Sequence, residues 1–152
     1  MGRSLATGTH VVKQCEHGLP LVIDVPPSIL GRTPTLFWLT CPYLKSKVGV
    51  LENQGFARLL SLKLREDGQI RHVFTRRLRK LRVERRELAG DSARDIPTTI
   101  LESGVDGTRD PLFVKCLHAH LADYLAGNDN PVGALVAQSV DLASCEGLCC
   151  PR

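Results

Sequence analysis

The chain has 152 residues and a formal net charge of +4 at pH 7, with 43% hydrophobic and 24% charged residues. This length and composition are typical of a soluble globular protein with one buried core. The N-terminus lacks the pattern of a secretory signal, and no apolar run approaches the roughly 18 residues that span a bilayer. We therefore expect a cytoplasmic protein without a membrane contact, folded as a single domain over residues 1–152 with flexible tails at 1–9 and 145–152.

Short β-branched and apolar runs near the N-terminus predict three strands, over residues 10–14, 21–25 and 35–39. Residues 15–20 between the first two strands have the composition of a turn. Three strands of this length are not stable alone and need helices over one face. The expected fold class is therefore α+β, with a small N-terminal antiparallel sheet of about three strands packed against a mainly helical remainder.

Helical periodicity and helix boundaries account for most of the remaining chain. Pro42 favours a helix start and places Cys41 at a helix N-terminus, where the helix dipole favours a thiolate. The predicted helices cover, in chain order, residues 42–53, residue 56 to the break at Asp67-Gly68, and residues 70–88, 96–101, 112–126 and 131–142.

The helix over residues 70–88 carries the basic character of the protein, because eight basic residues oppose one acidic residue between positions 71 and 86. Such a stretch could bind nucleic acid or an acidic protein, although charge runs more often face solvent. Arg77 and Arg85 fall within the apolar stripe of this helix and would point toward an acidic partner or an anion. The candidate contact residues are Arg77, Arg79, Arg82, Arg85 and Arg86.

Six cysteines need an explanation, because a cytoplasmic chain keeps its thiols reduced. The segment Cys116-Leu117-His118-Ala119-His120 places one thiol and two imidazoles within five residues, and folding can bring Cys15 and Cys41 to it. Thiolates with an imidazole suit zinc, and three or four cysteines suit an iron–sulfur cluster. The spacing alone is a weak signal, because these three cysteines include no local ligand pair. Further candidate ligands are His17, His120, Cys145 and Cys149.

The helical period leaves a choice between the two histidines. On a regular helix over residues 112–126, Cys116 and His120 share one edge of the buried face, since they are four residues apart. Cys116 can pair with His118 only if the helix begins late or is distorted there. The period therefore favours His120.

Three blocks of the chain resemble the bacterial domain of unknown function 501. They are Cys15-x-x-Gly18-x-Pro20, then Pro34-Thr35-Leu36-Phe37-Trp38-Leu39-Thr40-Cys41-Pro42, then Val114-Lys115-Cys116-Leu117-His118-Ala119-His120 with the run GNDNPVG at 127–133. The resemblance runs in order from about residue 10 to 135. It implies no reaction, but its pattern selects Cys15, Cys41, Cys116 and His118, whose chemistry is that of metal ligands, and so favours His118 over His120. The chain departs from the pattern at Glu16-His17.

These observations favour a metal-binding protein in which Cys15, Cys41, Cys116 and His118 or His120 hold zinc, with an iron–sulfur cluster as the second choice. An alternative is an enzyme that uses Cys116 or Cys41 as nucleophile and a histidine as base. The third hypothesis is a nucleic-acid or acidic-partner binding module that uses the basic helix.

Overall fold

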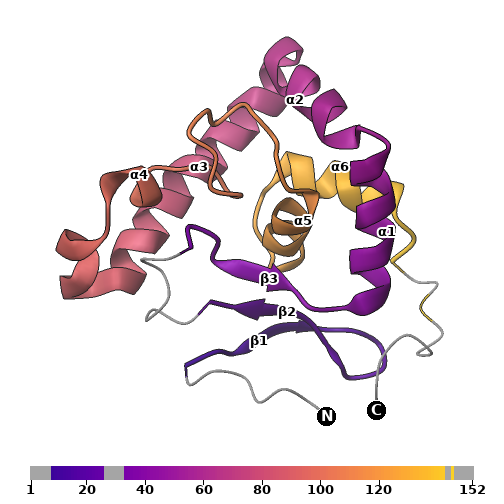
Figure 1. Cartoon of the computed structure of the whole chain (residues 1–152), viewed down its shortest axis with the longest axis horizontal. Coiled ribbons are helices and arrows are strands. Elements are labelled where there is room, and N and C mark those ends of the chain that lie inside the picture. The colour runs from indigo at the N-terminus through magenta and orange to yellow at the C-terminus, as the bar shows by residue number, and fades with distance from the viewer. Residues whose placement is uncertain (1–7, 26–32, 143–144, 146–152) are drawn as a thin grey trace.

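The computed structural model of the chain describes residues 8–25, 33–142 and 145. Three antiparallel strands, β1 (Val11–Gln14), β2 (Pro20–Asp24) and β3 (Phe37–Leu39), form a sheet in the order β1-β2-β3. The β3 edge lies nearest the helices and the β1 edge lies farthest from them (Figure 1). The predicted α+β class, with a small N-terminal antiparallel sheet and a mainly helical remainder, is confirmed.

Six α-helices follow the sheet within the described residues. They are α1 (Pro42–Asn53), α2 (Phe56–Glu66), α3 (Gly68–Ala89), α4 (Thr98–Leu101), α5 (Leu117–Leu125) and α6 (Pro131–Ser139), with a 3₁₀ helix over Gly90–Asp95. Cys41 is the N-cap of α1 and Pro42 its first residue, as predicted. Asp67 starts α3 because its carboxylate accepts the backbone N–H groups of Gln69 and Ile70.

Three predicted helices are clearly shorter in the structure than in the sequence analysis. The helix expected over residues 112–126 begins only at Leu117, the helix expected over residues 96–101 begins at Thr98, and the helix expected to reach Leu142 ends at Ser139. The late start of α5 has a tertiary cause, described below, and it changes which side chains meet.

Helix α5 is the central element of the fold. It packs against β3, β2, α1 and α6 (Figure 1), and its residues Leu117, Leu121 and Ala122 are completely buried. The close approach of α6 depends on Gly133, because a Cβ at that position would overlap the His120 carbonyl and the Tyr124 side chain. The start of α5 is therefore anchored in the core through Leu117.

The stripe predicted for α3 is buried at its centre, where Phe74, Leu78 and Leu81 enter the core. Arg77 and Arg85 are buried with them, as their positions in the stripe indicated. Within the described residues, no helix combines the length and the apolar character needed to cross a bilayer.

Candidate metal centre

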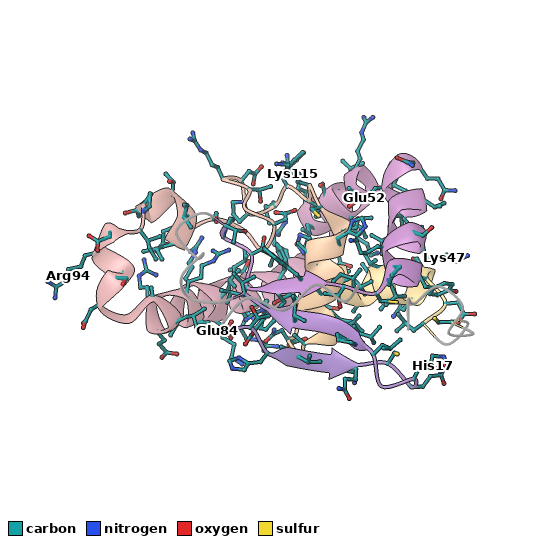
Figure 2. The ribbon with its side chains drawn as sticks, turned by 60° about the horizontal axis from the view of Figure 1, so that its bottom comes forward. His17, Lys47, Glu52, Glu84, Arg94 and Lys115 are labelled. Carbon is teal, nitrogen blue, oxygen red and sulfur yellow. The ribbon has the colours of Figure 1, made fainter. Side chains whose placement is uncertain are left out.

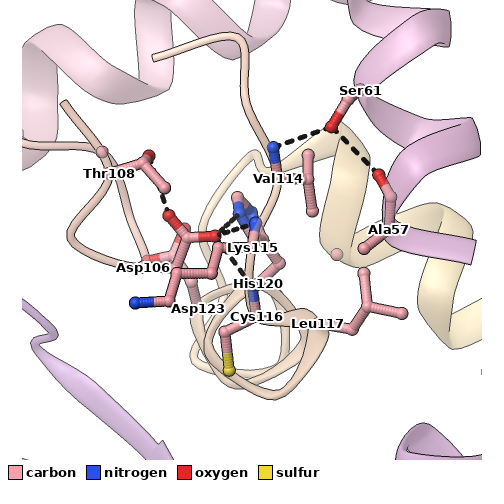
Figure 3. Close-up of polar contacts among 12 residues, drawn as sticks. Ala57, Ser61, Asp106, Thr108, Val114, Lys115, Cys116, Leu117, His120 and Asp123 are labelled. Carbon is pink, nitrogen blue, oxygen red and sulfur yellow. Dashed lines mark hydrogen bonds and ion pairs between the residues drawn. The ribbon is translucent and has the colours of Figure 1, made fainter. Parts of the chain in front are cut away.

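Two carboxylates from distant parts of the chain fix the start of α5. Asp106 Oδ2 accepts the backbone N–H groups of Lys115 (2.7 Å) and Cys116 (3.0 Å), and Glu52 Oε1 accepts the N–H of Leu117 (2.8 Å). Figure 3 shows Asp106 facing this turn. Since the first N–H groups of a helix have no partner within the helix, these acceptors stabilise a helix start at Leu117. Cys116 is left as the N-cap, with an extended backbone.

This helix start brings Cys116 and His118 together. Because Cys116 precedes the helix, the helical period no longer places it beside His120. One ligating atom from each of Glu52, Cys116 and His118 lies within 4.8 Å of the other two. Among the described residues, no other group of three or more histidine, cysteine or acidic side chains meets that distance. The expectation of a regular helix from Leu112, on which the pairing of Cys116 with His120 rested, is therefore wrong, whereas the family resemblance favours His118.

Both ring nitrogens of His118 have partners. Nδ1 lies 3.0 Å from Glu52 Oε1, and Nε2 lies 3.1 Å from the backbone carbonyl oxygen of Lys45. A carbonyl oxygen only accepts, so Nε2 carries a proton. The hydrogen bond to Cys116 raises the pKa of His118 to about 9 against the effect of burial, and Glu52 and the Lys45 carbonyl raise it further.

The group is partly open to solvent. The side chains of Glu52 and His118 are 29% and 28% exposed, and Cys116 is half-buried. Cys116 and His118 also line a groove of about 430 Å³, together with Trp38, Phe37 and Leu39 of β3. A small molecule can therefore reach the thiol and the imidazole from one side.

His120 occupies a different environment. Its side chain is 1% exposed, Nε2 lies 3.3 Å from Asp106 Oδ2, and Nδ1 lies 3.2 Å from Asn130 Nδ2. The amide of Asn130 is oriented by two contacts, since its Oδ1 accepts the N–H of Gly133 and its Nδ2 donates to Asp123. Asn130 Nδ2 therefore donates to His120 Nδ1, which leaves the ring proton on Nε2, facing Asp106. Both ring nitrogens of His120 form hydrogen bonds with buried side chains, so neither is available to bind a metal ion.

The other candidate thiols lie elsewhere. Cys15, Cys41 and Cys145 line a second cavity, of about 670 Å³, together with His17. Glu52 in the last turn of α1 and His17 in the β1–β2 turn lie well apart in Figure 2. The structure thus divides the predicted ligands into two sets. Cys149 lies outside the described residues.

Most candidate contact residues of the basic helix have partners within the chain. Arg77 forms a bidentate pair with Asp123 and also donates to Glu84. The remaining contacts join Arg85 to the carbonyl oxygens of Pro34, Leu101, Ser103 and Gly104, and Arg82 and Arg86 to Glu102. In the part of the chain that the structure describes, Arg79 has no such partner. Burial lowers the pKa of Arg85 to about 10, and the neighbouring charges of Arg77 and Arg82 add to the effect.

Two acidic residues of the site were not identified from the sequence. Glu52 lies in the last turn of α1, 65 residues from the N–H that it accepts, and Asp106 lies in a loop with turn composition. Neither belongs to a local ligand motif. The only sequence signal for these two residues was a carboxylate near a helix end. Because carboxylates are common at such positions, this signal does not single them out.

Comparison with known proteins identifies a family but no reaction. No curated protein and no solved structure matches the chain. The family model described as "Protein of unknown function (DUF501)" matches residues 11–138, which include both sets of candidate ligands except Cys145 and Cys149. The resemblance seen in the sequence is thereby confirmed, and the chain belongs to the DUF501 family of proteins of unknown function.

Proposed function

We propose that the protein binds a metal ion, most favourably zinc, through Cys116, His118 and Glu52. The observation that carries the proposal is the convergence of one ligating atom from each of these side chains within 4.8 Å. A thiolate, an imidazole and a carboxylate are all ligands that zinc accepts. They come from α1 and from the start of α5, two elements that pack against each other in the core.

The hydrogen bonds of His118 support this assignment. A histidine that binds a metal normally donates its other ring N–H to a carboxylate or a backbone carbonyl, which fixes the ring. Here Nε2 donates to the Lys45 carbonyl, so Nδ1, which faces Glu52, is the nitrogen for the ion. When no ion is bound, a proton on Nδ1 can take its place between the imidazole and the carboxylate.

Three protein ligands would leave a fourth zinc position open. Such an ion could polarise a bound water or a substrate oxygen. The groove beside Cys116 and His118 gives a substrate a route to this position, and the exposed indole of Trp38 forms part of its wall. Cys15 and Cys41 supply no ligand in this arrangement.

A second candidate function is nucleophilic catalysis by Cys116. It is favoured by the proximity of the Cys116 thiol to the His118 imidazole, within 4.8 Å, and by the contact of Glu52 with the same imidazole, since a Cys–His pair oriented by an acid is a common catalytic arrangement. However, a base needs one ring nitrogen for the thiol, and both nitrogens of His118 already face other acceptors. The metal site is therefore the better supported function.

Zinc titration of purified, metal-free protein tests the proposal. We expect the wild-type protein to bind one zinc ion more than His118→Ala at the same free zinc concentration. His72→Ala is the matched control, because His72 is exposed on α3 and has no partner among the described residues, so it should bind like the wild type. Equal zinc binding by the wild type, His118→Ala and Glu52→Gln would refute the proposal.

A further inference from the structure

One cavity brings together three thiols that are far apart in sequence. Cys15 lies in the turn after β1, Cys41 is the N-cap of α1, and Cys145 follows α6. All three are free thiols, and the cavity between them measures about 670 Å³. Neither Cys116 nor His118 lines it.

The turn that carries Cys15 is well defined. The Cys15 N–H donates to the Leu19 carbonyl, and the Gly18 N–H donates to the Cys15 carbonyl, with Gly18 at a φ of 73° that favours glycine. His17 in this turn lies 2.8 Å, through Nε2, from the carbonyl oxygen of Cys145. This contact holds the backbone of Cys145 beside the turn that carries Cys15.

The spacing of the sulfurs does not fit one ion. Sulfurs around a single zinc ion lie about 3.8 Å apart, because each Zn–S bond is about 2.3 Å long. The three sulfurs of this cavity do not all lie within 4.8 Å of one another, although the Glu52 group does meet that distance. The volume of about 670 Å³ also gives room for an occupant wider than one ion.

Apolar and aromatic side chains form part of the remaining lining, and such walls limit the access of water to a cluster. They are Leu21, Leu44, Leu125, Leu142, Tyr43 and Tyr124, and the other lining residues are Lys13, Gln14, Glu16, Gly127 and Asn128. Cys41 is buried at the N-terminus of α1, a helix of 12 residues, and has no hydrogen bond that caps the helix.

We infer that this cavity is a second metal site, which holds an iron–sulfur cluster through the thiolates of Cys15, Cys41 and Cys145. His17 lines the same cavity and is the candidate for the fourth ligand, through Nδ1, since Nε2 contacts the Cys145 carbonyl. The site is independent of Cys116, His118 and Glu52, so it can be correct whether or not those residues bind zinc.

Anaerobic incubation of the full-length protein with iron and sulfide tests the inference, with protein-bound iron and acid-labile sulfide measured after desalting. We expect the wild type to retain one cluster and to gain the visible absorption of sulfide-to-iron charge transfer. Cys15→Ser and Cys145→Ser, which lie at the half-buried rim, should lose most of the bound sulfide. Cys116→Ser removes a thiol outside the cavity and should retain the cluster, which makes it the matched control.

Circular dichroism of each variant separates a lost ligand from a lost fold, and the rim positions are chosen because Cys41 is part of the core. Failure of the wild type to retain sulfide would overturn the inference. So would sulfide retention that is the same in Cys15→Ser, Cys145→Ser and the wild type. Binding of one zinc ion by the three thiols, without sulfide, would replace the cluster by a mononuclear site and would also overturn it.

Discussion

Asp106 and His120 form a buried pair in which Oδ2 lies 3.3 Å from Nε2 and each side chain is only 1% exposed. The same carboxylate oxygen accepts the N–H groups of Lys115 and Cys116 at the start of α5 (Figure 3). One oxygen atom therefore joins the loop before α5, the N-cap of that helix and its buried imidazole. The position of Cys116 depends on this atom.

Replacing Asp106 by alanine should lower the free energy of unfolding by about 3 kcal/mol. The buried imidazole of His120 and the partly buried N–H of Cys116 would lose their acceptor, as would the exposed N–H of Lys115, and each unsatisfied buried group costs on the order of 1–3 kcal/mol. Urea denaturation measures the change. Asp91→Ala is the control, since Asp91 is exposed and should change the stability by no more than about 0.5 kcal/mol. Equal losses in the two variants would contradict the role of Asp106.

Stability should also fall in acid through Asp106. Burial alone would raise the pKa of this carboxyl group, but the hydrogen bonds from His120, Cys116 and Lys115 lower it below the ordinary value of 3.8. A lowered pKa in the folded state contributes stability that is complete above 3.8 and is lost as the pH falls toward the folded-state pKa. Unfolding free energies measured from about pH 5 to pH 2 should therefore fall more steeply for the wild type than for Asp106→Asn. Parallel profiles would show that other groups control the acid response.

The structural features that depend on local sequence patterns could be predicted from the sequence. The three strands, the start of α1 at Cys41-Pro42 and the burial of Arg77 and Arg85 follow from residue alternation, turn composition and helical period. The start of α5 could not be predicted in this way, because it depends on carboxylates that are remote in sequence. The helical period alone therefore predicted that α5 begins before Cys116, and on such a helix Cys116 would lie beside His120.

The division of the thiols into two sets could not be predicted from the sequence either. Cys15 and Cys41 share a cavity because the β1–β2 turn lies near the start of α1, whereas Cys116 faces the groove beside β3. The family blocks select all three cysteines together but carry no information on distances between them. Only the packing of α5 against the sheet and α1 separates the sets.

Breaking the buried ion pair between Arg77 and Asp123 should lower the free energy of unfolding far more than breaking the exposed pair between Arg76 and Asp129. Both Arg77–Asp123 and Arg76–Asp129 have N–O distances of 2.7 Å, but the first pair is 1% and 3% exposed and the second 59% and 68%. Asp123→Ala would leave a buried guanidinium with only Glu84 as a charged partner, so the free energy of unfolding should fall by about 3–5 kcal/mol.

Asp129→Ala is the matched control for this pair, and it should cost at most about 1 kcal/mol because water screens an exposed ion pair. Thermal or urea unfolding of both variants provides the comparison. The double variant Arg77→Met/Asp123→Leu should recover part of the loss, since it removes both buried charges together. A double variant less stable than Asp123→Ala would show that the hydrogen-bond network, rather than an unpaired charge, determines the cost.

Gly133 and Gly49 should respond in opposite directions to alanine. A Cβ at Gly133 would overlap the His120 carbonyl and the Tyr124 side chain, so Gly133→Ala must push α6 away from α5 and should cost on the order of 1–3 kcal/mol. A Cβ at Gly49, within α1, meets nothing within 4 Å, and Gly49→Ala should stabilise the protein by about 0.5–1 kcal/mol. Melting temperatures measure both effects, and a neutral Gly133→Ala would mean that the two helices can separate at little cost.

The accessibility of Cys116 distinguishes a metal ligand from a nucleophile. If Cys116 binds zinc with His118 and Glu52, a stoichiometric amount of zinc should slow its alkylation by iodoacetamide at least tenfold, because a coordinated thiolate is no longer free to react. His118→Ala and Glu52→Gln should abolish this protection, whereas the control His72→Ala should keep it. Mass spectrometry of the peptide that contains Cys116 measures the rate separately from the other thiols. If His118 instead acts as a base for a nucleophilic Cys116, alkylation should be fast in the wild type, slower in His118→Ala and unaffected by zinc. The two functions thus predict opposite effects of the same substitution: loss of zinc protection in one case, and loss of intrinsic reactivity in the other.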